Sequence, residues 1–284
     1  MSSITPFTRA RLEAPPCYPQ RWPVGEPDWN VNDPTYRPHE FTAKVVLDNA
    51  EDKHDGNKWA DVEKIPMSVL RKRKTFVDGQ EDSLEDTHIL MNSKRRRYCF
   101  PGGRTGIVGR GLLGRWGPNH AADPIVTRFN KSGELEVILV TRADTGTLAF
   151  PGGMVNPGET HTQTLLAEFT EEAAKPTGTV DRLFATCKRG VIYKGPVDDP
   201  RTTDEAWIET IAVHFHATEE IGDDLVLQTS DVTEVRHVAW YVVDGIDTMY
   251  ASHKAWLEIV VKGMTKQIKK TRTKVTEKKK DLMA

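Results

Sequence analysis

The chain has 284 residues, of which 38% are hydrophobic and 28% are charged, with a formal net charge of −2 at pH 7. These values are typical of a folded protein with one large or two modest domains. No apolar run approaches the roughly 18 residues of a spanning helix, which excludes a membrane span in this sequence. The three cysteines form no Cys-x-x-Cys pair, which argues against a disulfide framework or zinc site and favours a reducing compartment.

The N-terminal third predicts little regular structure. Residues 1–40 are rich in proline and carry interleaved tryptophans and tyrosines, so we expect an extended arm wrapped over a folded body. Residues 41–49 predict a strand, and the polar residues 51–58 predict a loop. Basic clusters at 71–74 and 94–97 predict exposed loops, although a bipartite nuclear signal is a weaker alternative.

Residues 102–123 are unusually rich in glycine and arginine. Gly109, Gly111 and Gly114 satisfy the Gly-x-Gly-x-x-Gly pattern of dinucleotide folds. No strand pattern precedes them and Gly117-Pro118 interrupts any helix, so we reject that interpretation. The glycines instead predict close approach by other backbone, and the arginines are available to bind phosphate or structural carboxylates.

From residue 124 onward the pattern alternates between strands and helices. This pattern predicts five strands and a C-terminal helix over residues 252–269. The expected strands cover residues 125–129, 136–142, 191–195, 205–216 and 235–243. Strands around one or two helices predict an α/β or α+β layer architecture, with a mixed sheet sandwiched between helices.

The most informative stretch is a glycine-rich loop followed by an acidic helix. Proline and glycine at five positions between 150 and 158 exclude a regular element there, and a helix is expected from Gly158 to Lys175-Pro176. Glu168, Glu171 and Glu172 fall on one face of that helix, opposite an apolar face. An ordinary solvated acidic face is one interpretation of this pattern, and a site for a hard cation such as Mg²⁺ is the other.

The spacing of this stretch resembles the signature of the Nudix hydrolases. The matching residues are Gly153, Glu159, Glu168, Phe169, Glu171 and Glu172. Two positions differ, because Ala167 stands where the family has arginine and Ala174 where it usually has glycine. The resemblance implies a Nudix fold preceded by a smaller N-terminal subdomain. In the family the arginine holds the glutamates by charge-assisted hydrogen bonds. Its absence is therefore expected to affect the rigidity of the ligands and the turnover rate more than metal binding itself.

Residues 102–123, residues 193–207 and the Tyr250-Ala-Ser-His253 segment sharpen the resemblance. They are similar to the ADP-ribose pyrophosphatase subfamily, and equally to the ADP-ribose-binding C-terminal domain of the melastatin-type (TRPM) cation channels. By this resemblance Glu168 and Glu172 are metal ligands, aided by a carbonyl at Gly152 or Gly153, and Glu171 is a further ligand or base. Asp199, Arg201, Tyr250 and His253 are expected to bind substrate near the terminal ribose.

Simpler structural roles were considered for several of these residues. Arg201 has nearby aspartates with which it can form a structural salt bridge, and Tyr250 can be a core residue at a helix entry. His214 and His216 lie two residues apart on one strand, but no third ligand stands at a useful spacing. They are therefore expected to be exposed strand histidines and not a metal site.

The expected domains are an N-terminal arm and small α+β subdomain over residues 1–118, a Nudix domain over 119–262 and a basic tail over 263–284. From Lys262 onward nine lysines and arginines face two acids, which is typical of a solvated end. No module for reading nucleic-acid sequence accompanies this charge.

The expected function is Mg²⁺-dependent hydrolysis of ADP-ribose to AMP and ribose 5-phosphate, with Mn²⁺ as a possible substitute. One alternative is an ADP-ribose-sensing domain of a TRPM-type channel that retains this hydrolase activity, in which case the partner is the rest of the channel polypeptide. Another is a Nudix enzyme for a nucleotide sugar or dinucleotide. A cytoplasmic location is expected; the mitochondrion is the alternative, since the first twelve residues carry two arginines and no acid.

Overall fold

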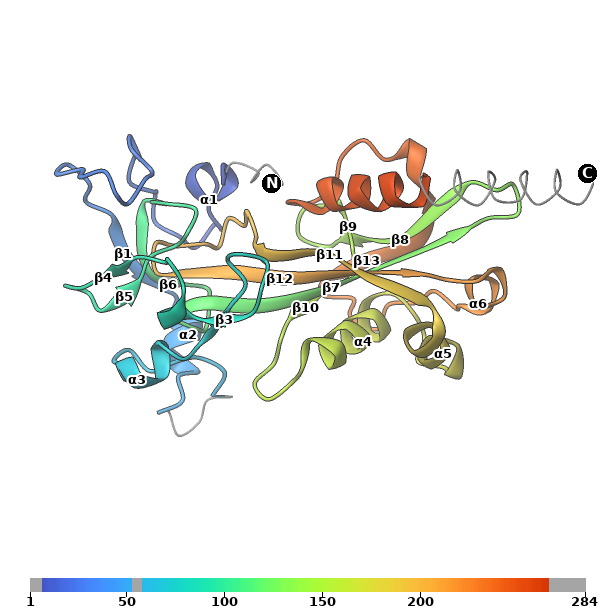
Figure 1. Cartoon of the computed structure of the whole chain (residues 1–284), viewed down its shortest axis with the longest axis horizontal. Helices are drawn as coiled ribbons and strands as arrows, with labels where there is room; N and C mark the ends of the chain where they lie inside the picture. Colours follow the sequence, from blue (N-terminus) through green and yellow to red (C-terminus); the bar gives the residue numbers. More distant parts are fainter. Residues whose placement is uncertain (1–6, 53–57, 266–284) are drawn as a thin grey trace, which may run out of the picture. The chain divides into compact units, whose positions relative to one another are not determined.

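The computed structural model describes residues 7–52 and 58–265, and it has the expected mixed α/β architecture (Figure 1). The described helices and strands are α1 (Arg9–Leu12), β1 (His39–Thr42), α2 (Lys44–Asp48), α3 (Met67–Leu70), β2 (Lys74–Thr75), β3 (Asp82–Ser83), η1 (Leu84–Asp86), β4 (Met91–Asn92), β5 (Arg97–Tyr98), β6 (Ile107–Gly111), β7 (Gly117–Phe129), β8 (Leu135–Arg142), β9 (Leu148–Ala149), β10 (Gly153–Met154), α4 (His161–Glu172), α5 (Gly178–Thr186), β11 (Lys188–Pro196), β12 (Ala206–His216), α6 (Glu219–Asp224), β13 (Val235–Val242) and η2 (Val243–Gly245). A further helical segment covers residues 253–265. The predicted basic tail beyond residue 265 lies outside the described residues.

One mixed sheet provides the scaffold. Its strand order is β11-β12-β7-β8-β13, with β10 paired to β7 and β9 paired to β8. The β7–β8 hairpin forms at the predicted place, because Asn130 Oδ1 accepts hydrogen bonds from the backbone amides of Ser132 and Glu134. In the described part of the chain no helix is both long and apolar enough to cross a membrane.

The chain divides into two compact units. The first comprises Met1–Pro124, Pro151–Phe169 and Tyr193–Ala212, and the second comprises Ile125–Phe150, Thr170–Ile192 and Val213–Ala284. This division does not follow the order of the sequence. The loop after Phe150 and most of α4 pack with the N-terminal residues, so the acidic helix is not confined to the C-terminal half.

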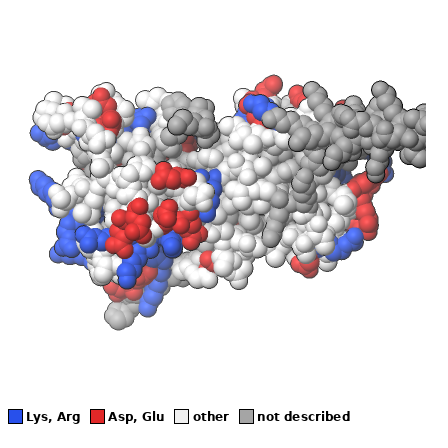
Figure 2. Space-filling view, viewed as in Figure 1, with Lys and Arg blue, Asp and Glu red and all other residues white. Residues whose placement is uncertain are grey.

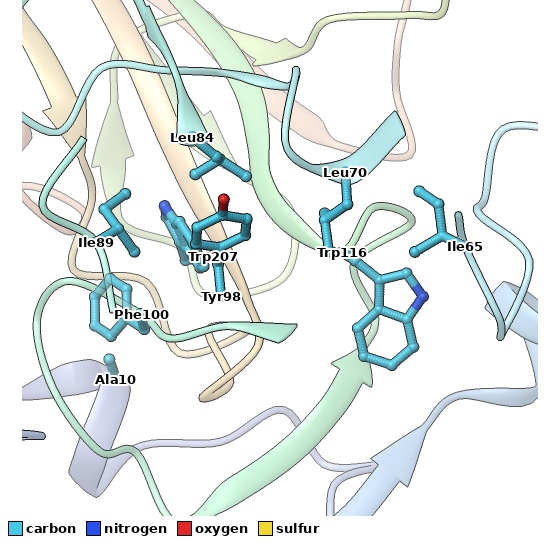
Figure 3. Packing of buried hydrophobic residues seen from close by; sticks show 9 residues of the cluster. All are labelled: Ala10, Ile65, Leu70, Leu84, Ile89, Tyr98, Phe100, Trp116 and Trp207. Atoms are coloured by element: carbon cyan, nitrogen blue, oxygen red, sulfur yellow. The ribbon is translucent and has the colours of Figure 1, made fainter. Parts of the chain in front are cut away.

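The first unit has an aromatic core. Buried side chains from the arm, α3, η1, the residue before β7 and the start of β12 pack together in it (Figure 3). The largest are Trp116, Trp207 and Phe100, each at most 1% exposed, and the arm contributes Phe7 and Ala10. Burying such aromatic side chains gives each about 1.5–3 kcal/mol. The arm is therefore part of the folded unit, as its aromatic content predicted.

The glycines of residues 102–123 let the arm approach closely, as expected. A Cβ on Gly103 would lie 2.4 Å from the carbonyl oxygen of Pro27, and one on Gly106 would lie 2.4 Å from that of Trp22. Both glycines also have positive φ angles, +92° and +87°, which other residues rarely adopt. Larger residues at either position would push the arm away.

The second unit is a smaller α/β assembly. Strand β8 pairs with β13 along its whole length, from Arg142 opposite Val235 to Glu136 opposite Val242. Helix α5 and the helical segment 253–265 lie on opposite faces of these strands (Figure 1). The strands are therefore covered by helices on both faces, as the layer prediction required.

The prediction of a strand over residues 41–49 was wrong. Strand β1 ends at Thr42, and the next residues form helix α2, in which Lys44 Nζ lies 2.6 Å from Asp48 Oδ2. Val46 alone turns into the core, while Val45 and Leu47 are exposed. An i,i+4 ion pair and one buried contact thus outweigh the β propensity of the two valines.

Strand β7 begins earlier than predicted. The expected strand started at residue 125, whereas β7 starts at Gly117 and includes Pro118. Proline is tolerated at the first residues of a strand, where no ladder hydrogen bond needs its missing N–H. This extension puts Ala121 and Ala122 opposite the glycine-rich loop.

The two basic clusters are only partly solvated. Arg73 donates two hydrogen bonds to the buried carboxylate of Asp61, which also accepts from Arg115 and from the backbone amide of Trp116. Arg95 forms an ion pair with Glu205, which is 3% exposed. The remaining charges intermingle in sign on the visible face (Figure 2). Several of these arginines are therefore structural.

We expect Asp61→Asn to destabilise the protein by about 3 kcal/mol, because it leaves two arginines without their buried anion. Urea unfolding followed by circular dichroism measures this change. Asp223→Asn is the matched control, since Asp223 pairs with Arg128 on the surface, where the cost is about 1 kcal/mol or less. Equal losses in both variants would contradict the assignment.

Candidate functional site

The acidic helix begins with a capping box that the sequence analysis did not use. Thr160 Oγ1 accepts a hydrogen bond from the Gln163 amide, and Gln163 Oε1 accepts one from the Thr160 amide at 2.8 Å. This reciprocal arrangement, readable as Thr-x-x-Gln, fixes the start of α4 at His161. Thr164 Oγ1 also donates to Glu159 Oε2, which ties the signature glutamate of the loop to the first turn.

Glu168 lies directly against the glycine of the loop. A Cβ on Gly153 would lie 2.3 Å from Glu168 Oε1 and 2.6 Å from Oε2. Any side chain at residue 153 would force the carboxylate to move, so glycine is what leaves it in this position. Gly153 is held in turn by pairing with Ala122 of β7. The structure therefore brings together two of the predicted site residues, Gly153 and Glu168.

The other two glutamates of the helix differ in environment. Glu172 is 6% exposed, whereas Glu171 is exposed. The carbonyl of Glu171 accepts hydrogen bonds from the amide and hydroxyl of Ser230, so its backbone anchors a loop of the second unit. Glu168 and Glu172 are four residues apart on α4 and share a face, while Phe169 and Ala173 are fully buried. A uniformly solvated acidic face is thus excluded.

A divalent cation suits this donor set. Carboxylate and carbonyl oxygens are the ligands that Mg²⁺ and Mn²⁺ take, and Glu168, Glu172 and the Gly153 carbonyl carry oxygens of these kinds. Within the described residues, no three His, Cys, Asp or Glu side chains are grouped so that they hold a metal ion by themselves. An ion here would therefore complete its coordination with backbone, water or substrate oxygens, as Mg²⁺ usually does.

Asp199 and Arg201 form a bidentate ion pair. Arg201 Nε lies 2.9 Å from Asp199 Oδ1, Arg201 Nη2 lies 2.9 Å from Oδ2, and the Arg201 amide donates to Oδ1 as well. Burial would raise the pKa of Asp199, but the charge and hydrogen bonds of Arg201 outweigh it and hold that pKa below its usual value. The salt-bridge role considered for Arg201 is confirmed. Its side chain is also 38% exposed, so one surface of the cation faces solvent.

The arm holds the loop that carries this ion pair. Arg21 Nη2 donates to the carbonyls of Pro200 and Thr202, and Tyr18 Oη donates to the carbonyl of Arg201 at 2.8 Å. Three backbone amides at the start of α1 donate to the Asp198 carboxylate. Both Tyr18 and Arg21 are buried. Sequence reasoning placed the arm over the body but missed that it shapes this loop.

Tyr250 and His253 belong to the second unit, where they fix the strand that enters the signature loop. His253 Nδ1 accepts a hydrogen bond from the Phe150 amide at 2.9 Å, and its ring stacks on that of Phe150. The Tyr250 amide donates to the Leu148 carbonyl, and its ring packs on a buried cluster. Tyr250 is therefore partly buried at the edge of this cluster. Binding of substrate by either residue stays a prediction.

His214 and His216 share one buried hydroxyl. Thr127 Oγ1 lies 2.7 Å from His214 Nε2 and 2.9 Å from His216 Nδ1. Both histidines are partly buried, so the expectation that they are exposed was wrong. The hydroxyl of the neighbouring strand satisfies the two rings, which supplies a structural reason for their spacing.

Sequence reasoning also missed Asp123. This carboxylate is 7% exposed and accepts a hydrogen bond from Thr210 Oγ1. Burial raises the pKa of Asp123 to about 7, against the opposing effects of the Thr210 hydrogen bond and the positive charge of Arg201. The only sequence signal was its position before Pro124, which restricts it to an extended backbone.

Comparisons with known proteins identify the family. Residues 23–117 match the model described as "NUDT9-like, N-terminal domain", and residues 118–259 match the "NUDIX domain" model. The chain is 40% identical over 258 residues to the protein named "ADP-ribose pyrophosphatase, mitochondrial" of Rattus norvegicus, covering 82% of this chain and 70% of that protein.

Two further likenesses were found. The chain is 40% identical over 267 residues to "Transient receptor potential cation channel subfamily M member-like 2" of Nematostella vectensis, covering 83% of this chain but only 16% of the channel. A solved structure of the NUDIX domain of Shewanella oneidensis NrtR with ADP ribose is 16% identical, with a TM-score of 0.41, and the match covers 52% of this chain and 88% of that one.

We expect Gly153→Ala to lower turnover at least about tenfold while it changes the free energy of unfolding by only about 1 kcal/mol. The added methyl group displaces a flexible carboxylate and no core atom, so Glu168 moves and the fold remains. Steady-state kinetics and urea unfolding measure the two effects. Gly178→Ala is the control, because nothing lies within 4 Å of a Cβ there. A fully active Gly153→Ala variant would refute this role of the glycine.

Nudix ADP-ribose pyrophosphatases generally depend on a divalent metal ion, in accord with the oxygen donors at Gly153 and Glu168. The family models together match residues 23–259. This chain belongs to the Nudix hydrolases and carries a NUDT9-like N-terminal domain in front of its NUDIX domain.

Proposed function

We propose that the protein hydrolyses ADP-ribose to AMP and ribose 5-phosphate in the presence of Mg²⁺, with Mn²⁺ as a substitute. The observation that carries this proposal is the packing of the Glu168 carboxylate on Gly153, at the signature spacing of the family. The 40% identity to an ADP-ribose pyrophosphatase supports the choice of substrate.

Hydrolysis adds one water across the diphosphate linkage. A new P–O bond forms at one phosphorus, the bridging P–O bond breaks, and the two phosphates separate with release of a proton. A bound divalent ion would activate the water and neutralise charge on the diphosphate oxygens. In this proposal Glu168, Glu172 and the Gly153 carbonyl hold that ion, and Glu171 is a further ligand or base.

Arg201 is proposed to recognise the distal half of the substrate. Its guanidinium is fixed by Asp199 on one edge and faces solvent in part, so the loop presents a cation whose direction is set before substrate binds. Asp199 is proposed to act with it, and Tyr250 and His253 are proposed as further substrate-binding residues.

A sensing role in a channel is the second candidate. The observation in its favour is the 40% identity to a TRPM-type channel, of which this chain matches 16% of the length. Channel domains without catalysis have lost the first glutamate of the acidic cluster, whereas Glu168 is present here. We therefore propose that hydrolysis is retained in either context. The proposed location is the cytoplasm, with the mitochondrion as the alternative.

The direct test is incubation with ADP-ribose and Mg²⁺, with chromatographic separation of the products. Nucleotide sugars and dinucleotides are tested in parallel as alternative substrates. We expect AMP and ribose 5-phosphate from ADP-ribose, and at least about 100-fold slower turnover in Glu168→Gln and Glu172→Gln, because each loses one proposed ligand. Faster cleavage of another diphosphate, or tight binding without products, would overturn the proposal.

Arg201→Ala should weaken ADP-ribose binding about tenfold or more and AMP binding much less, since a charge-assisted hydrogen bond contributes roughly 1.5–3 kcal/mol. Calorimetry in the Glu168→Gln background measures binding without turnover. Arg201→Lys keeps a positive charge beside Asp199 but lacks the planar guanidinium. It therefore distinguishes the effect of losing the charge from that of losing the hydrogen-bond geometry. Arg182→Ala is the control, because its ion pair with Glu220 lies on the surface. Equal weakening of both ligands would contradict the placement at the distal ribose.

A further inference from the structure

Two carboxylates flank the consecutive glycines of the signature loop. Glu168 of α4 lies against Gly153, as described above. On the adjacent residue, a Cβ on Gly152 would lie 2.4 Å from Asp123 Oδ1 and 3.0 Å from its Cγ. Asp123 thus occupies the space that any side chain at Gly152 would need.

The strand pairing explains why Asp123 sits there. Gly153 pairs with Ala122 and Met154 pairs with Ala121, so the loop runs antiparallel to β7 and Gly152 comes opposite Asp123. Pro124 keeps the backbone of Asp123 extended. All of these residues belong to the first unit.

Thr210 fixes the carboxylate from behind. Its hydroxyl donates to Asp123 Oδ2, and Thr210 itself is 1% exposed in strand β12. One carboxylate oxygen is therefore held by β12 and the other faces Gly152. A buried group with so little freedom can hold a neighbouring backbone in one conformation.

We propose that Asp123, oriented by Thr210, is a positioning residue that fixes the Gly152–Gly153 backbone and, through it, the place of the Glu168 carboxylate. It acts through the loop and touches no reacting atom in this proposal. The inference deepens the proposed function, on which its kinetic consequence rests, while the effect on the loop stands on the geometry alone.

Hydrogen–deuterium exchange of a peptide covering residues 150–156 tests the effect on the loop without any ligand. We expect Asp123→Asn, which preserves size, to raise exchange there about fivefold or more, and Thr210→Val to act in the same direction. Thr210→Ser keeps the hydroxyl and should match the wild type. Asp204→Asn removes another fully buried carboxylate that accepts from Thr105 and Tyr36, and it should leave this peptide unchanged.

Kinetics supply the second measurement. In Asp123→Asn we expect kcat for ADP-ribose to fall about tenfold and KM to change less than about threefold, because the binding loop around Arg201 remains. Unchanged exchange at residues 150–156, or a rise spread evenly over the whole chain, would overturn the inference. If the wild type does not cleave ADP-ribose, the proposed function fails, and the exchange data still decide the role of Asp123. Should Asp123→Asn not fold, Thr210→Val carries the same test.

Discussion

The contact between the Glu168 carboxylate and the bare Cα of Gly153 is the constraint on which the site depends. A helix can present an acidic side chain in many rotamers, and a glycine-rich loop has more freedom than any other backbone. In this structure the helix and the loop restrict one another, because the Glu168 carboxylate fills the space that a side chain at residue 153 would need. The capping box at Thr160 fixes where the helix starts, so the carboxylate reaches the loop in one register.

The same contact offers an explanation for the tolerance of Ala167. At residue 167, where the family has arginine, this chain has alanine. Glu168 nevertheless rests against backbone that is paired into the sheet, and Glu172 is buried by its surroundings. Packing can replace part of what charge-assisted hydrogen bonds do for a ligand. The arrangement favours rigidity of the acidic face without the usual arginine.

The sequence predicted the chemistry better than the boundaries. Glycine, proline and acid spacing located the loop, the acidic helix and the ion pair of Arg201, because these depend on local backbone rules and short-range contacts. The helix at Lys44–Asp48 was missed because a local ion pair and the burial of Val46 outweigh the β propensity of its valines. The early start of β7 was missed because it depends on packing with distant residues. Asp123 and Thr210 were missed for the same reason, as residues 87 positions apart in sequence meet only in the fold.

The contacts of the N-terminal arm link the folding of the first unit to the order in which the chain is synthesised. Asp198 accepts hydrogen bonds from Thr8, Arg9 and Ala10, residues that precede it by 188 to 190 positions. At roughly 5–20 residues per second, these three residues are synthesised about 10–40 s before Asp198. The amides at the start of α1 stay without their native acceptor during that interval, so this helix can reach its final position only after residue 198 has been made.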